Sequence, residues 1–270
     1  MKREKIFRAV MAVTIMFAAL TSAMATEKTL KVKIAGEGIE EAKMYVQPMQ
    51  PGLDVQSCEM ERTGNEFAAQ VEASAENLYR LIYICRQTQT IVPLYAEGEL
   101  LNVSLVLDGN MPVATDNDNN KALSAMGRFV AANDRAMWER RPQESAVIKA
   151  MLGAYSVAAD SILSIYKCRP NVAQYIKMWG YTSTYNSYVS LPNMLGVRPD
   201  ALPLKASEVM DKPYNVIDSP MASLFPIVPS LVANFLPRKA SLSEQMDSLY
   251  ANYSCRELTD KVSAAVMEKY

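Results

Sequence analysis

The stretch Leu78–Leu107, LYRLIYICRQTQTIVPLYAEGELLNVSLVL, decides the fold. It predicts three consecutive strands: Leu78–Cys85 and Thr90–Tyr95 are rich in β-branched and aromatic residues, and Leu101–Leu107 has leucine or valine at every second position. The polar RQTQ forms the first turn, and Ala96–Glu99 forms the second around a glycine that accepts a positive φ. Neither strands nor turns carry a nucleophile, a metal cluster or a phosphate loop, so the stretch predicts architecture rather than chemistry.

The residues before this stretch also alternate between apolar and polar side chains at short spacing. The segments expected to be strands are Thr29–Ala35, Ala42–Val46, Asp54–Arg62 and Glu66–Glu72, the last two forming a hairpin around Thr63-Gly64-Asn65. About seven strands without an intervening helix predict an antiparallel β-sandwich or barrel over residues 27–110.

A helical period replaces this pattern after Asp108–Thr115, which we expect to be an exposed linker. The features that predict helices over 116–270 are an apolar face at Ala122, Ala125, Met126, Phe129 and Val130, helix-starting prolines Pro142 and Pro170, a proline-interrupted segment Pro220–Leu236, and a capping box at Ser241–Glu244. The predicted class is therefore α+β with segregated domains: an antiparallel β domain followed by an all-α domain.

The first 25 residues have the features of a secretory signal peptide. Lys2, Arg3, Lys5 and Arg8 are basic, Ala9–Leu20 is apolar but too short to span a membrane, and Ala23-Met24-Ala25 is a small-x-small cleavage site. We expect cleavage after Ala25 and a secreted protein. No cysteine lies at the cleavage point, which argues against a lipoprotein anchor.

Composition excludes several classes of function. Without residues 1–25 the chain has 24 Lys and Arg against 28 Asp and Glu, a net charge of −4, so we expect no nucleic-acid partner and no binding to the anionic membrane surface. The chain has no histidine, which removes Ser-His-Asp and Cys-His catalysis and histidine-ligated zinc. No carboxylate pair lies in an apolar pattern that would raise a pKa. We therefore predict no catalytic residue, no metal ligand and no cofactor.

Four cysteines, Cys58, Cys85, Cys168 and Cys255, are candidate structural disulfides in an oxidising compartment. Their spacing contains no CxxC, which excludes a redox dithiol and a zinc ribbon. The pairing Cys58–Cys85 with Cys168–Cys255 keeps each bridge within one domain. The alternative is that all four are buried or surface thiols.

An aromatic-rich run, Trp179, Tyr181, Tyr185 and Tyr188, is the candidate interaction surface. Aromatic faces of this kind stack on sugars or peptides. The other interpretation is the core side of a helix with tyrosine hydroxyls reaching water.

The run Asp116-Asn-Asp-Asn-Asn120 begins like a calcium-binding loop. The sixth position is Lys121 instead of glycine and the twelfth is Gly127 instead of glutamate, so the sharp turn and the bidentate carboxylate are both missing. We expect these residues to cap a helix.

The order of these features resembles a known family. The runs Gly64–Val71, Leu78–Leu105, DNDNNKALSAM at 116–126 and LSEQMDSLYANYSCRELTDKVSAAVMEKY at 242–270 resemble the N-terminal half of periplasmic TlpA-like, thioredoxin-like thiol–disulfide oxidoreductases of Gram-negative bacteria. In that family a C-terminal thioredoxin domain carries a WCxxC motif. No cysteine of this chain lies in such a motif, so none inherits the catalytic role.

Two functions remain open. The resemblance implies a non-catalytic module that positions or supports a thioredoxin-like domain involved in cell redox homeostasis, in cis if the natural chain continues. The last predicted helix reaches Tyr270 without a stop signal, which agrees with continuation. The alternative is a stand-alone periplasmic protein that binds a ligand or a partner protein through its aromatic helical surface.

Overall fold

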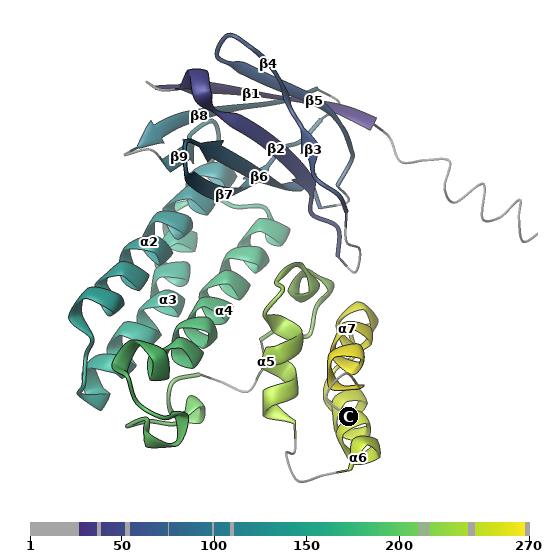
Figure 1. Ribbon diagram of the computed structural model, residues 1–270. Coiled ribbons are helices and arrows are strands. Elements are labelled where there is room, and N and C mark those ends of the chain that lie inside the picture. The colour runs from purple at the N-terminus through teal and green to yellow at the C-terminus, as the bar shows by residue number, and fades with distance from the viewer. Residues whose placement is uncertain are drawn as a thin grey trace, which may run out of the picture.

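The computed structural model describes residues 27–36, 39–51, 55–74, 76–98, 100–108, 111–210, 213, 216–236 and 241–267. The predicted signal peptide lies outside these residues. A β region forms one end of the molecule and a helical region forms the other (Figure 1). The predicted class, α+β with segregated β and α regions, is confirmed.

The β region is a sandwich of two sheets. Its strands are β1 Glu27–Ala35, β2 Lys43–Pro48, β3 Cys58–Glu59, β4 Glu61–Thr63, β5 Glu66–Glu72, β6 Leu78–Cys85, β7 Thr88–Tyr95, β8 Leu100–Asp108 and β9 Met111–Ala114, with a short 3-10 turn, η1, at Ile39–Glu41. One sheet has the order β4-β5-β1-β8-β9 and the other β3-β2-β6-β7. Nine strands are thus described where the sequence predicted about seven.

Alternating side chains fill the space between the sheets. Leu101, Val103 and Leu105 of β8 are buried, whereas the residues between them face water. They share a core with residues of the opposite sheet such as Met44 and Leu81. This is the period of two expected for strands with one dry face.

One strand pair departs from the predicted antiparallel arrangement. Strand β8 pairs with β1 in parallel, Leu30 lying opposite Leu101, while every other described strand pair is antiparallel. The chain leaves one sheet at the end of β7 and enters the other at Leu100, and Gly98 between them has a φ of 93°. Because this connection changes sheets, β8 does not fold back on β7 and arrives beside β1 in the same direction.

The expected linker at 108–115 is largely part of the sheet. Met111–Ala114 is strand β9, antiparallel to β8, and Val113 and Ala114 are buried. The hydroxyl of Ser124 lies 3.0 Å from the Ala114 amide nitrogen, from which it accepts, and 3.2 Å from the Ala114 carbonyl oxygen, to which it donates. The chain therefore passes from sheet to helix through a packed segment.

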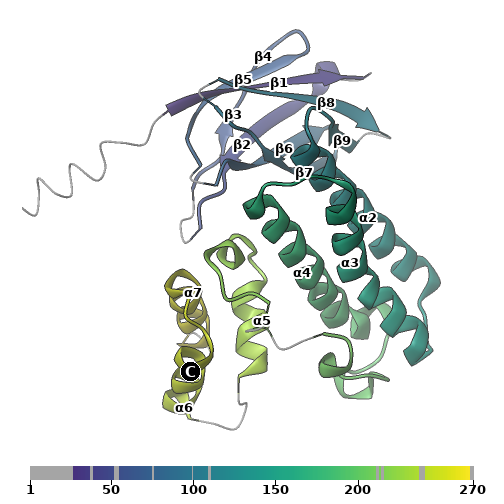
Figure 2. The same ribbon diagram turned by 180° about the vertical axis from the view of Figure 1, so that it is seen from behind.

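The helical region contains two groups of helices (Figures 1 and 2). The first group is α2 Asp118–Arg140, α3 Ser145–Ile165 and α4 Pro170–Leu195; the second is η5 Pro220–Leu224, α5 Val228–Phe235, α6 Leu242–Asn252 and α7 Arg256–Met267; the short turns η2 Pro199–Ala201 and η3 Ala206–Glu208 lie between the groups. The break between η5 and α5 occurs in the proline-interrupted segment, as expected. Ser241 and Glu244 form the predicted capping box of α6.

Pro142 does not start a helix. Arg141 ends α2 in the left-handed region at φ 44°, and Glu144 is the extended residue before α3. The four residues Arg141–Glu144 lie outside both helices and reverse the chain between them, so α3 begins at Ser145. Pro170 does lie in the first turn of α4, as the sequence predicted.

Within the described residues one helix, α3, is long and apolar enough to cross a membrane by length and composition alone. Its mean hydropathy is 1.4, and 28% of that window is buried inside the molecule. Apolar helices in the core of soluble proteins meet the same criterion, so the length and hydropathy of α3 are weak evidence for a membrane-spanning helix.

The two regions are joined by a buried asparagine. Asn120, on the first turn of α2, is fully buried. Its side-chain oxygen accepts from the amide of Tyr95 at 2.7 Å, and its side-chain nitrogen donates to the carbonyl of Tyr95 at 2.8 Å. Tyr95 ends the edge strand β7, so Asn120 supplies the partners that a neighbouring strand would otherwise provide.

Helix α7 packs through its own apolar face. Leu258, Val262 and Val266 are at most 2% exposed and belong to the same core as α5 and η5. The carboxylate of Asp218 accepts from the backbone amides of Ser254 and Cys255 just before this helix. As far as Met267, the described part of α7 therefore has the packing of a stable helix.

Candidate functional site

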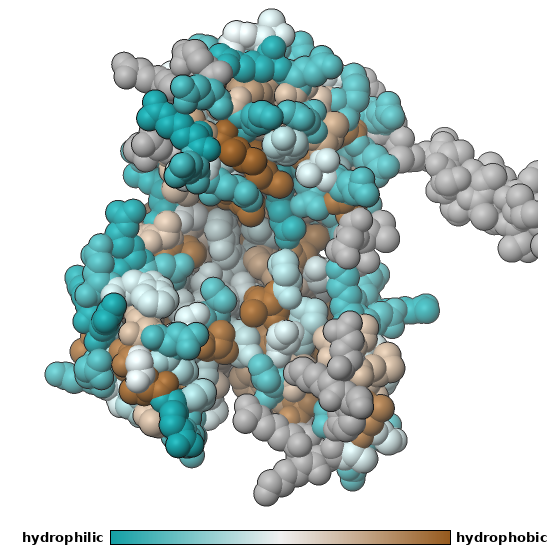
Figure 3. All heavy atoms as spheres, in the orientation of Figure 1, coloured by the Kyte–Doolittle hydropathy of each residue, from teal (hydrophilic) through white to brown (hydrophobic). Residues whose placement is uncertain are grey.

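A hollow with polar and aromatic walls lies between the two groups of helices. It has a volume of about 480 Å³, within the range of small-molecule sites. Its lining residues are Val130 and Asp134 of α2, Trp179, Thr182, Ser183, Asn186 and Ser187 of α4, and Phe225, Pro226 and Ile227 between η5 and α5. These residues are called the cleft below. Figure 3 shows one face of the molecule, where the surface is hollowed between the two groups of helices and apolar side chains lie in and beside the hollow.

The apolar wall of the cleft is part of a fixed aromatic cluster. Tyr175, fully inside the core, stacks on Phe225 with ring centres 4.8 Å apart and an interplanar angle of 28°. Tyr175 also meets the Trp179 ring edge-on at 6.0 Å. Offset and edge contacts of this kind hold aromatic rings in one orientation, so Trp179 and Phe225 form a preorganised surface.

The polar wall is organised around Asp134. One of its carboxylate oxygens, Oδ1, accepts from the hydroxyl of Tyr155 and from that of Ser187, the latter at 3.2 Å. The two hydroxyls are themselves 2.8 Å apart. Burial, followed by the nearby Asp134, raises the pKa of Tyr155 to about 12, so this phenol remains protonated and donates throughout the neutral range. The network joins α2, α3 and α4 and fixes the carboxylate at the edge of the cleft.

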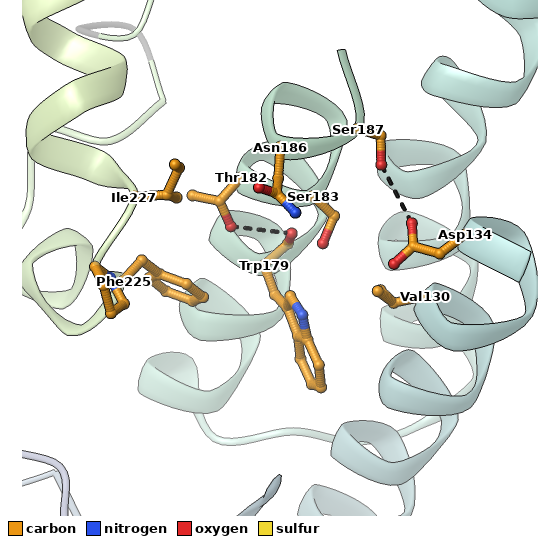
Figure 4. Close-up of a pocket in the computed structure, with 10 residues that line it drawn as sticks. Val130, Asp134, Trp179, Thr182, Ser183, Asn186, Ser187, Phe225 and Ile227 are labelled. Carbon is orange, nitrogen blue, oxygen red and sulfur yellow. Dashed lines mark hydrogen bonds between the residues drawn. The ribbon is translucent and has the colours of Figure 1, made fainter. Parts of the chain in front are cut away.

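Figure 4 shows how the polar side chains face the space. Asp134 from α2 and Ser183 from α4 point toward each other, with the indole of Trp179 below them in this view. Thr182 bonds back to the carbonyls of Met178 and Trp179, so its hydroxyl is occupied by its own helix. The groups that remain available to a ligand are the Asp134 carboxylate, the Ser183 hydroxyl and the Asn186 amide.

Of the four predicted surface aromatics, only Trp179 lines the cleft. Tyr181 and Tyr185 are 5% and 3% exposed and belong to the helical core. Tyr188 is half-buried in a separate cluster, where its hydroxyl donates to the carbonyl of Leu204 at 3.4 Å. The surface prediction is therefore wrong for these three tyrosines, because α4 is packed on several sides and leaves little of its circumference to water.

The candidate disulfides do not form. All four cysteines belong to the described part of the chain, and no bridge joins Cys58, Cys85, Cys168 or Cys255. Cys58 lies opposite Val46, which in turn lies opposite Leu81. Cys85 is four residues further along β6, which puts it about 10 Å across the sheet and about 13 Å along it. A disulfide needs Cα atoms within about 7 Å, so the sheet register forbids the first pairing.

The Asp116–Asn120 run caps α2, as expected. Asn117 is the capping residue and its side chain accepts from the amide of Asn120 at 2.9 Å. Asp118 and Asn119 accept from backbone amides ahead of α4, at Lys167 and Arg169. These oxygens are thus used to hold two helix ends together.

The sequence patterns did not indicate Asp134, Asn186 or Phe225 as binding residues. The position of Asp134 could have been predicted from the helical period, because it lies four residues after Val130 and so continues the inward face of α2. A carboxylate at such a position is unusual and marks a local polar function. No local pattern indicated Phe225, since its place beside α4 depends on a connection of about 30 residues after the end of that helix.

No protein-family model matches the chain, and no curated protein matches it either. In the part of the chain that the structure describes, no cluster of three or more Cys, Asp or Glu side chains is placed to hold a metal ion. The cleft offers a ligand aromatic, hydroxyl, amide and carboxylate contacts.

Proposed function

We propose that this chain is the non-catalytic N-terminal module of an exported, TlpA-like thiol–disulfide oxidoreductase, and that it positions or supports a thioredoxin-like domain in the periplasm. The resemblance of its sequence patterns to that family suggests the context. The dispersal of the four cysteines over β3, β6, the start of α4 and the start of α7 carries the non-catalytic part of the proposal. A dithiol needs two sulfurs within bonding reach, which the Cys58 and Cys85 register does not give.

The thiol environments support the same conclusion. Burial, aided by the Asp118 carboxylate, raises the pKa of the Cys168 thiol above its ordinary value. Burial also raises the pKa of the Cys255 thiol, and Glu257 and Asp218 add to the effect. Catalytic cysteines have lowered pKa values because the thiolate is the nucleophile. Their raised pKa values therefore make these two thiols poorer nucleophiles than an ordinary cysteine, which disfavours a redox role.

An insulin-reduction assay with dithiothreitol tests the proposal. We expect the purified chain to precipitate insulin at the rate of the blank, with a single-domain thioredoxin as the positive control. Turnover well above the blank that is lost on alkylation of one cysteine would contradict it.

The cleft favours a second candidate, a stand-alone periplasmic binding protein. Trp179 and Phe225 present fixed rings beside the Asp134 carboxylate, which is the arrangement of a recognition site rather than of a reaction centre. Reading the gene downstream of the Tyr270 codon separates the two candidates: an in-frame thioredoxin domain favours the module, and an immediate stop favours the binding protein.

A further inference from the structure

The Asp134 carboxylate has no cationic partner among the described residues. None of the ion pairs found there includes it, although seven other pairs are formed. Its Oδ1 atom is held by Tyr155 and Ser187, whereas no described group hydrogen-bonds to Oδ2. A half-buried carboxylate held in one place and left without a counterion favours a positive charge from outside the chain.

The two cationic residues on the walls of an adjoining hollow are engaged elsewhere. A second hollow of about 170 Å³ shares Phe225 and Pro226 with the cleft and is lined by Arg80 and Lys261. Arg80 donates to the carbonyl of Leu224, and Lys261 donates to that of Ser223 at 3.5 Å. Asp134 is the only ionisable residue of the cleft itself.

The apolar walls of the cleft set a second requirement on its ligand, an apolar body beside the positive charge. The Trp179 and Phe225 rings favour an apolar body, and an aromatic face also attracts a cation within about 6 Å of its centre. A volume of about 480 Å³ holds a ligand much larger than a bare ammonium ion. Ser183 and Asn186 supply neutral hydrogen-bonding groups at the rim.

We propose that the cleft binds an organic amine, whose ammonium group pairs with Asp134 and whose apolar body lies against Trp179 and Phe225. The ammonium donates to Oδ2, and its remaining hydrogens reach Ser183 or water. The proposal rests on the binding role of the cleft and not on the redox context, so the insulin assay and the binding assay fail independently.

Calorimetric titration with two matched probes tests this assignment. Phenethylammonium carries the charge, and phenethyl alcohol has the same aromatic body without it. We expect the ammonium to bind the wild-type chain about tenfold more tightly than the alcohol, a factor equal to ~1.4 kcal/mol. Equal affinities, binding of neither probe, or preference for a neutral sugar such as methyl glucoside would overturn the assignment.

Variants separate the charge from the rings. Asp134→Asn keeps an oxygen for Tyr155 and Ser187, and we expect it to weaken ammonium binding by about tenfold while leaving alcohol binding unchanged. Trp179→Leu is expected to weaken both probes. Asp160→Asn removes an exposed carboxylate from α3 and serves as the charge control, with no change for either probe.

A test of folding separates loss of binding from loss of structure in the variants. Each variant is titrated only after its circular dichroism and thermal unfolding match the wild type. If Asp134→Asn does not fold, the salt dependence of the wild-type chain replaces it: added sodium chloride should weaken ammonium binding and leave alcohol binding unchanged. Ammonium binding that is insensitive to both the substitution and salt would overturn the proposal.

Discussion

Replacing Asn120 by alanine should lower the free energy of unfolding by about 3 kcal/mol, because the buried amide and carbonyl of Tyr95 then lose their partners. Each orphaned group costs about 1–3 kcal/mol when water cannot reach it. Urea denaturation followed by circular dichroism measures the change. We also expect the wild-type chain to unfold in one transition, since Asn120 and Ser124 join the sandwich to α2.

Asn193 provides the matched control for this substitution. It is exposed on α4 and its side chain forms no hydrogen bond with a described residue, so Asn193→Ala should change the free energy of unfolding by less than about 0.5 kcal/mol. If Asn120→Ala proved as mild as Asn193→Ala, or if the wild-type β and helical regions unfolded in separate steps, Asn120 would not be the anchor between them.

Substitution by alanine should change the free energy of unfolding in opposite directions at two glycines of adjacent helices, Gly180 and Gly153. A Cβ atom at Gly180 of α4 would lie 3.0 Å from the carbonyl oxygen of Tyr155 and 3.2 Å from the Cβ of Ala159, both on α3. Overpacking of this kind costs about 1–3 kcal/mol, which exceeds the gain in helix propensity. Gly180→Ala should therefore destabilise the protein by about 2 kcal/mol.

Gly153 of α3 lies in open space, with no atom within 4 Å of its added Cβ. Gly153→Ala should raise the free energy of unfolding by about 0.5–1 kcal/mol, because alanine restricts the unfolded chain and favours the helix. Thermal unfolding of the two variants side by side checks the pair. Stabilisation by Gly180→Ala would mean that α3 and α4 do not approach each other as closely as described.

Local pattern was sufficient to predict most of the elements. The alternation in Leu78–Leu107 predicts strands close to β6, β7 and β8, and Ser241 with Glu244 predicts the start of α6. These features depend on neighbours a few residues apart. The parallel pairing of β8 with β1 joins segments about 70 residues apart, and no short-range signal encodes it.

The cleft was less predictable because its walls come from distant parts of the chain. Trp179 belongs to the aromatic run that the sequence indicated and is half-buried in the wall of the cleft, but Tyr181 and Tyr185 of the same run are core residues. Helix α4 carries small polar residues on buried sides, such as Thr184, whose hydroxyl donates to the carbonyls of Gly180 and Leu152 at 3.1 Å. These hydrogen bonds satisfy the buried hydroxyls, so polar residues can occupy buried positions of α4. The sequence of α4 therefore lacks the apolar periodicity by which a buried helix face is usually recognised.

The pH dependence of thiol alkylation most directly tests the central claim that this chain does not itself perform thiol chemistry. In a Cys58→Ser, Cys85→Ser variant, only Cys168 and Cys255 react, and their raised pKa values place both alkylation midpoints above that of an unperturbed cysteine in a short control peptide. Iodoacetamide labelling followed by mass spectrometry measures each midpoint separately. Midpoints above that of the control peptide agree with a non-catalytic module, whereas a midpoint below it at either cysteine would contradict the claim and indicate an activated nucleophile.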